Sequence, residues 1–212
     1  LIATALLANP PAPDPTMAAL QKGAAAAREG RYADAQALME SARVTLAKQP
    51  PSRLHAGVLY RLALLREAQS DAEGAMTYVR ASEAMYVQLG SWPDAAGVAD
   101  GAARAHERAG QIAEADAAFR RAVDHLGQPG NSPVTQGDAV NKYGVFLLKQ
   151  RRAKDAVAAF GRALKLVDPH LDDHVAFKGL VAVNLAIAWY EVDPTKALPH
   201  LAEARKRAAL HE

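Results

Sequence analysis

Small and large apolar residues recur along the chain at the spacing of one helix face. Ala156, Phe160 and Ala163 lie four and then three residues apart, which places them on one side of an α-helix. The same order of small, large apolar and alanine residues occurs in four other segments: Ala35, Met39, Ala42; Gly74, Tyr78, Ala81; Ala115, Phe119, Ala122; and Ala197, Leu201, Ala204. The steps from 35 to 74, 115, 156 and 197 are 39, 41, 41 and 41 residues. This near-constant period indicates an internal repeat.

A second helical segment and a short turn precede each of these triplets. Gly30 and Gly110 follow a helical pattern directly, where a left-handed capping residue is expected. Asp34, Glu114 and Asp155 then fall in the first turn of the next helix, where the helix dipole favours negative charge. Proline and glycine separate one unit from the next, and no segment has the pattern of a strand. Each unit of about 40 residues is therefore predicted to be two antiparallel helices.

One such helix pair buries too little apolar surface to fold alone, so the units are expected to stack on a continuous core. We predict a single solenoid over 17–212, with repeats at about 17–50, 52–90, 93–128, 133–169 and 172–210. Residues 1–16 are either the tail of a preceding helix or the remnant of a signal peptide. The charged segment 201–212 has the composition of a terminal cap.

Composition removes several classes of function. The chain has no cysteine, which excludes disulfides and thiolate chemistry but leaves both a cytoplasmic and an exported or periplasmic location open. The net charge of +2 is too small to indicate nucleic acid or an anionic membrane as a partner. No stretch approaches the roughly 20 apolar residues of a membrane span.

The sequence contains no motif of a known catalytic or phosphate-binding site, so we predict neither an enzyme nor a cofactor. His170 and His174 could share a metal ion if their segment were helical, but Pro169 favours a loop in which Asp172 or Asp173 caps the next helix. No metal site is therefore predicted.

Individual histidines and tryptophans point to packing more than to chemistry. His55, His106 and His125 fall on helical segments, where a partly buried or surface histidine is the more common case. Trp92 is expected in a loop, over a repeat junction or against a partner, and Trp189 in the core.

The repeat pattern resembles the tetratricopeptide repeat (TPR). The best match covers 140–169, where Gly144 stands at the glycine of the first helix. Ala156, Phe160 and Ala163 match the second helix, and Asp168 with Pro169 matches its end. The second repeat is the weakest match, because Gly74 stands where alanine is usual. The period of about 41 is longer than the usual 34 and is similar to that of kinesin light chains and of sensor regions in some bacterial transcription activators.

This resemblance implies an all-α fold, a right-handed superhelical solenoid of about five antiparallel helix pairs. It also implies a concave groove, lined by the first helices, that binds a peptide or a protein segment. The candidate groove residues are Tyr60, Leu64, Asp100, Arg104, Glu107, Arg108, Asn141, Val145, Leu148, Lys149, Asn184, Ile187 and Tyr190. The expected function is a non-enzymatic protein-interaction scaffold. Two alternatives stay open: the sensor or regulatory region of a larger signalling or transcription-activating protein, and an enzyme whose site has no recognisable motif.

Overall fold

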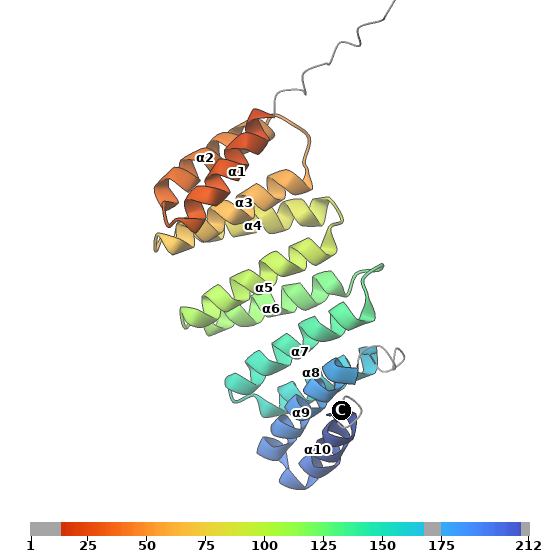
Figure 1. Ribbon diagram of the computed structural model, residues 1–212. Helices are drawn as coiled ribbons and strands as arrows, with labels where there is room; N and C mark the ends of the chain where they lie inside the picture. Colours follow the sequence, from red (N-terminus) through yellow and green to blue (C-terminus); the bar gives the residue numbers. More distant parts are fainter. Residues whose placement is uncertain (1–13, 168–174, 209–212) are drawn as a thin grey trace, which may run out of the picture. The chain divides into compact units, whose positions relative to one another are not determined.

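The computed structural model describes residues 14–167 and 175–208, and in these ranges the chain is helical apart from its turns, with no strand (Figure 1). The helices are α1 (Pro15–Arg28), α2 (Tyr32–Leu46), α3 (Arg53–Ala68), α4 (Ala72–Gln88), α5 (Trp92–Arg108), α6 (Ile112–Leu126), α7 (Pro133–Lys149), α8 (Ala153–Val167), α9 (Val175–Val192) and α10 (Pro194–Ala208). The all-α prediction is confirmed for these residues.

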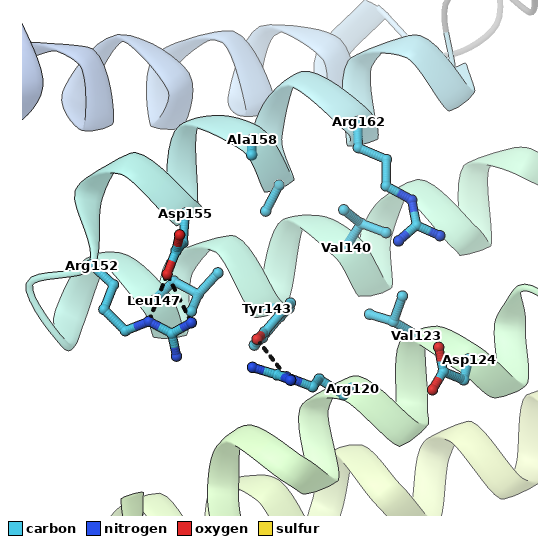
Figure 2. A pocket seen from close by; sticks show the side chains of 11 residues that line it. Arg120, Val123, Asp124, Val140, Tyr143, Leu147, Arg152, Asp155, Ala158 and Arg162 are labelled. Carbon is cyan, nitrogen blue, oxygen red and sulfur yellow. Dashed lines mark hydrogen bonds and ion pairs between the residues drawn. The ribbon is translucent and has the colours of Figure 1, made fainter. Parts of the chain in front are cut away.

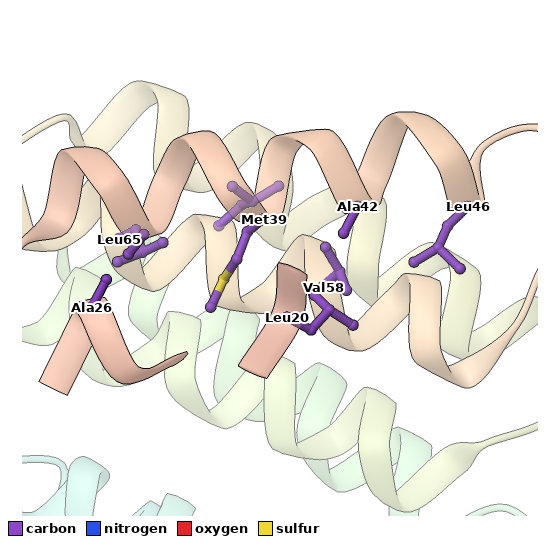
Figure 3. Packing of buried hydrophobic residues seen from close by; sticks show 9 residues of the cluster. Leu20, Ala26, Met39, Ala42, Leu46, Val58 and Leu65 are labelled. Atoms are coloured by element: carbon purple, nitrogen blue, oxygen red, sulfur yellow. The ribbon is translucent and has the colours of Figure 1, made fainter. Parts of the chain in front are cut away.

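The chain forms two compact units, Leu1–Met85 and Tyr86–Glu212, called here the N-terminal and the C-terminal unit. Within the N-terminal unit, α1, α2 and α3 enclose one apolar core (Figure 3). Leu20 from α1, Met39 and Leu46 from α2, and Val58 and Leu65 from α3 are all buried in it. The division of the chain into five repeats stays a prediction.

Turns inside the helix pairs follow the period that the sequence indicated. Gly30 and Gly110 have φ of +76° and +72°, so the predicted left-handed caps are confirmed. Ser70 and Arg151 hold the same conformation, with φ of +63° and +60°, although neither is a glycine. The positive φ values at 30, 70, 110 and 151 therefore mark one turn in each of the first four helix pairs.

The triplets of α2, α6 and α8 are buried as predicted. Met39, Phe119 and Phe160, the large residues of these triplets, are between 0% and 5% exposed. The small residues on either side of them are buried too. A small side chain lets the two helices of a pair approach closely, and the large one fills the space between them.

In α4 the predicted triplet is wrong by one residue. The buried positions are Ala75, Val79 and Ser82, whereas Ala81 is exposed. Asp71 sets this register, because its Oδ1 accepts the backbone N–H of Gly74 at 2.9 Å and so caps the start of α4. The corrected positions 35, 75, 115, 156 and 197 are 40, 40, 41 and 41 residues apart, which is a more regular period than the predicted one.

Ser82 stands where the other second helices carry alanine. It is fully buried, and its hydroxyl donates a hydrogen bond to the carbonyl oxygen of Ala56 at 2.8 Å. This bond satisfies the only polar group that the substitution of serine for alanine adds to the helix contact.

The fifth triplet also departs from prediction. Ala197 and Ala204 are buried, but Leu201 is 47% exposed. In the part of the chain that the structure describes, no further helix follows α10 to cover this side chain.

Trp92 was expected in a loop, which is wrong. It is the first residue of α5, and its ring stacks on that of His125 from α6 with a centroid distance of 6.2 Å. The following Pro93 explains the difference, since proline is favoured in the first turn of a helix.

Gly144 makes a sharp packing prediction. A Cβ atom at this position would lie 2.6 Å from Cε1 of Phe160, which is closer than van der Waals contact allows. We expect Gly144→Ala to lower the free energy of unfolding by about 1–3 kcal/mol. Gly161→Ala on α8 is the control, because its Cβ meets no atom within 4 Å and alanine should stabilise that helix by about 0.5–1 kcal/mol. Urea unfolding followed by circular dichroism measures both, and a loss at Gly161 as large as that at Gly144 would contradict the packing.

His55 makes the stability of the protein depend on pH. Burial lowers the pKa of its imidazole below the ordinary value of 6.5, and the positive charge of Arg43 lowers it further. The unfolded chain therefore takes up a proton at a pH where the folded chain leaves His55 neutral. Stability contributed by the neutral ring is present above about pH 6.5 and decreases as the pH falls below it. Urea unfolding at about pH 7.5 and about pH 5.5 measures this effect. Between the two pH values, the free energy of unfolding should fall further in wild type than in His55→Gln. Equal decreases would show that His55 does not contribute.

Candidate functional site

A groove opens between the first helices α1 and α3 of the N-terminal unit. Its volume is about 520 Å³, and the buried side chains of Met39 and Leu65 contribute to its lining. The residues that line it are Ala24, Ala27, Arg28, Tyr32, Met39, Arg61, Leu64, Leu65 and Ala68. We call it the α1/α3 groove.

The lining of the α1/α3 groove is apolar and cationic. Leu64 and Tyr32 are partly exposed in it, although both carry large hydrophobic surfaces. Arg28 and Arg61 are the charged residues among its described lining residues, none of which is a carboxylate. Such a surface is suited to a ligand that combines apolar side chains with negative charge.

A second groove lies at the same repeat position in the C-terminal unit, between α5 and α7. Phe119 and Phe146 replace Met39 and Leu65, and the volume is about 220 Å³. The residues that line it are Asp100, Arg104, Glu107, Phe119, Asn141, Lys142, Val145, Phe146 and Lys149. We call it the α5/α7 groove.

The charged side chains of the α5/α7 groove form ion pairs. Lys149 Nζ lies 3.1 Å from Glu107 Oε1, which joins α7 to α5 across the groove. Arg104 pairs with Asp100 along α5, and Lys142 Nζ lies 2.7 Å from Oδ2 of Asp138 along α7. A ligand binding here would have to compete with these pairs.

The structure brings together about half of the predicted groove residues. Asp100, Arg104, Glu107, Asn141, Val145 and Lys149 line the α5/α7 groove, and Leu64 lines the α1/α3 groove. The others, which line neither groove, are Tyr60, Arg108, Leu148, Asn184, Ile187 and Tyr190.

Asn184 makes a hydrogen bond inside the chain. Its Nδ2 donates to Oδ1 of Asn141 at 2.9 Å, so the two amides join α9 to α7. One donor of Asn184 and one acceptor of Asn141 are therefore used in a contact between α9 and α7.

Residues of the first repeat were missed altogether. Ala24, Ala27 and Arg28 line the α1/α3 groove, but α1 has no aromatic residue and little charge to draw attention to it. The period supplied the missing signal, because Ala24 and Leu64 lie 80 and 40 residues before the predicted Arg104.

Helix α9 carries an exposed apolar stripe. Leu180, Val183, Ile187 and Tyr190 are all exposed, and their spacing of three, four and three residues places them on one face. A soluble helix usually exposes its polar residues, so this stripe is a second candidate contact surface.

On the C-terminal unit, α6, α7 and α8 also border a cavity of about 410 Å³ (Figure 2). Tyr143 lies at its centre, where its hydroxyl accepts from Arg120 Nε at 3.0 Å and donates to Oδ1 of Asp116 at 2.9 Å. Arg152 Nη1 donates to the same Oδ1 at 2.7 Å. Burial raises the pKa of Tyr143, the hydrogen bond from Arg120 opposes this change, and Asp116 adds to it, so the phenol stays protonated at neutral pH. These bonds connect α6 and α7 to the turn before α8.

Among the described residues, no group of three His, Cys, Asp or Glu side chains is placed to hold a metal ion. The segment 168–174, which contains the histidine pair weighed in the sequence, lies outside the described residues. None of the described helices is long and apolar enough to cross a membrane.

No family model matches the chain, and no curated protein does. Solved structures do match it. BtubC (BKLC) of P. vanneervenii shares 16% identity over 89% of this chain and 78% of that chain, with a TM-score of 0.68. A putative kinesin light chain of Podosopora anserina, with nearly identical TPR-like repeats, shares 15% over 94% and 99%, with a TM-score of 0.68. The C-terminal part of a TPR repeat-containing protein of Cytophaga hutchinsonii shares 11% over 92% and 68%, with a TM-score of 0.69.

These matches show that the chain has a TPR-like helical solenoid fold. The resemblance drawn from the sequence is confirmed at the level of the fold.

Proposed function

We propose that this protein is a non-enzymatic interaction scaffold that binds a peptide or protein segment against its first helices. One observation carries the proposal: a groove opens between consecutive first helices at the same repeat position in both units. Both grooves have buried apolar residues in their lining, and they differ in the charged residues beside them. A site that recurs in this way is suited to contact side chains of an extended or helical segment.

The two grooves differ in the ligand chemistry that they favour. The α1/α3 groove offers Arg28 and Arg61 beside apolar surface, without a carboxylate to neutralise them. The α5/α7 groove offers charge of both signs, already paired through Glu107 and Lys149. We therefore assign the larger share of binding energy to the α1/α3 groove, and discrimination between partners to the α5/α7 groove.

Affinity purification from the native source tests the proposal. Leu64→Glu places a charge in the α1/α3 groove, and Leu54→Glu is its matched control on the same helix, since Leu54 is exposed but lies outside the groove. A second variant combines Arg104→Ala, Asn141→Ala and Lys149→Ala in the α5/α7 groove of the C-terminal unit. Circular dichroism first establishes that all variants are equally helical.

A partner that wild type and Leu54→Glu retain, and that Leu64→Glu loses, supports binding in the α1/α3 groove. Retention by both groove variants would contradict the proposal and would move the contact to other faces of the helices. Purified wild type that acts on a substrate would contradict the non-enzymatic assignment.

A further inference from the structure

The cavity bordered by α6, α7 and α8 has a counterpart in the N-terminal unit that a side chain occupies. Tyr78 lies three residues after Ala75, the first residue of the corrected triplet of α4. It packs against the apolar core of α1, α2 and α3, and its hydroxyl donates to Oε2 of Glu40 in α2 at 3.1 Å. Tyr78 therefore spans the space from one second helix, α4, to the second helix of the repeat before it, α2.

In the C-terminal unit an alanine stands at the place of Tyr78. Ala159 lies three residues after Ala156, the first triplet residue of α8. Its methyl group is too short to span the space to α6, and the cavity of about 410 Å³ lies beside it (Figure 2). Val140 and Leu147 of α7 contribute apolar surface to the lining. A volume of this size is within the range of small-molecule sites, and it has room for an aromatic ring.

The polar group that α6 offers to this space is the reverse of the one that α2 offers to Tyr78. Five residues after the first triplet residue, α2 carries Glu40, which accepts the proton of the phenol, whereas α6 carries Arg120. A guanidinium group donates hydrogen bonds and accepts none. A ring that takes the place of Tyr78 in the C-terminal unit therefore needs an acceptor at this end, and a carboxylate is a strong one.

Arg162 supplies the cavity with a second guanidinium group, and this one is not engaged. Arg120 and Arg152 both pair with Asp116, at 2.8 Å and 2.7 Å. Arg162 extends from α8 toward Val140 of α7, and it forms no ion pair among the described residues (Figure 2). An acidic group that enters the cavity can therefore pair with Arg162 without displacing a carboxylate of the chain.

Two carboxylates belong to the lining as well. Asp155 is paired with Arg152 at 2.8 Å, so its charge is compensated. Asp124 of α6 forms no ion pair with Arg162 or with any other described residue. Its charge opposes the binding of an anion, which makes its removal an informative test.

We propose that this cavity binds a small aromatic carboxylate, with its ring in the place that Tyr78 takes in the N-terminal unit and its acidic group between Arg120 and Arg162. The site lies between second helices and is separate from the grooves between first helices, so it goes beyond the scaffold function. A ligand bound there would connect α6 to α8 as Tyr78 connects α2 to α4.

The probe is p-toluate, because it is the tyrosine side chain with a carboxylate in place of the hydroxyl group. Its amide, p-toluamide, has the same shape without the charge, and acetate has the charge without the ring. Heteronuclear NMR of the backbone amide groups, titrated with each compound on the whole protein, measures affinity and locates the contact. We expect p-toluate to bind with a millimolar dissociation constant and to shift the amide signals of Tyr143 and Ala159. The two control compounds should bind at least about ten-fold more weakly.

Four variants test the assignment of residues. Ala159→Tyr places in the cavity the side chain that the N-terminal unit has, and it should abolish binding. Arg162→Gln should weaken binding by about ten-fold, because it removes the unpaired cation. Lys165→Gln is the matched control, since it removes an exposed cation of the same helix that does not line the cavity. Asp124→Asn should bind more tightly than wild type, and circular dichroism first establishes that all four are equally helical.

Binding that is weakened in Arg162→Gln and retained in Lys165→Gln supports the proposal, and its loss in Ala159→Tyr supports the place of the ring. No shift of any amide signal in wild type overturns the proposal. Equal affinity for p-toluate and p-toluamide overturns it too, because the carboxylate would then play no part. Shifts confined to Leu64 and its neighbours in the α1/α3 groove also overturn it, because the probe would then occupy the peptide site.

Discussion

Replacing Phe160 by alanine should lower the free energy of unfolding of the C-terminal unit by about 3–5 kcal/mol. Phe160 is fully buried, and its ring packs against the backbone of Gly144, where there is no side chain to move into the space. The substitution therefore removes a large apolar side chain and leaves a cavity that neighbouring residues cannot close. Urea unfolding followed by circular dichroism measures the loss.

Leu201→Ala is the matched control for this prediction, because Leu201 holds the same position in the fifth triplet and is about half exposed. We expect this change to lower the free energy of unfolding by about 1 kcal/mol, in proportion to the smaller area removed from water. Losses of similar size for the two variants would show that the triplet of α10 is as well packed as that of α8. They would contradict the partial exposure of Leu201.

Asp116→Ala should lower the stability of the C-terminal unit by about 1–3 kcal/mol. The Asp116 carboxylate is largely buried, and it accepts hydrogen bonds from Tyr143 and Arg152 and pairs with Arg120 Nη2 at 2.8 Å. Its removal breaks hydrogen bonds that join α6 to α7 and to the turn before α8. It also leaves the partly buried Tyr143 hydroxyl without its acceptor.

Asp155→Ala is the control for Asp116. Asp155 pairs with the same Arg152 at 2.8 Å, but its side chain is about half exposed, so its loss should change stability by no more than about 0.5 kcal/mol. Thermal unfolding of both variants decides between the two cases. Equal and small shifts would mean that the hydrogen bonds of Asp116 to α7 and to the turn before α8 add little to stability.

The helix pairs were predictable because the same turn and the same triplet of small and large apolar residues recur along the chain. Gly30 and Gly110 follow helices where a left-handed residue was expected. Asp34 lies in the first turn of α2, where negative charge was expected. The error in α4 had a local cause. Tyr78 resembled the large residue of a triplet, whereas the cap formed by Asp71 turned Val79 inward, and such a one-residue choice depends on the turn rather than on hydrophobicity.

The grooves were less predictable because their charges are paired over long separations. Glu107 and Lys149 are 42 residues apart, and only the fold shows that they neutralise each other. Conversely, Arg28 and Arg61 line the α1/α3 groove with no carboxylate among its described lining residues. Neither fact is visible from residue type and spacing, because both depend on which side chains the helix packing brings together.

Site-specific photo-cross-linking tests the central claim most directly. A photoreactive residue is placed at Leu64 in the α1/α3 groove, at Val145 in the α5/α7 groove, or at Ala158, which lines the separate cavity of α6, α7 and α8. Each protein is irradiated in extract of its native source, and cross-linked partners are identified by mass spectrometry. The scaffold account predicts one partner cross-linked at Leu64 or Val145 and absent at Ala158. A partner cross-linked at Ala158 and at neither groove position would contradict it.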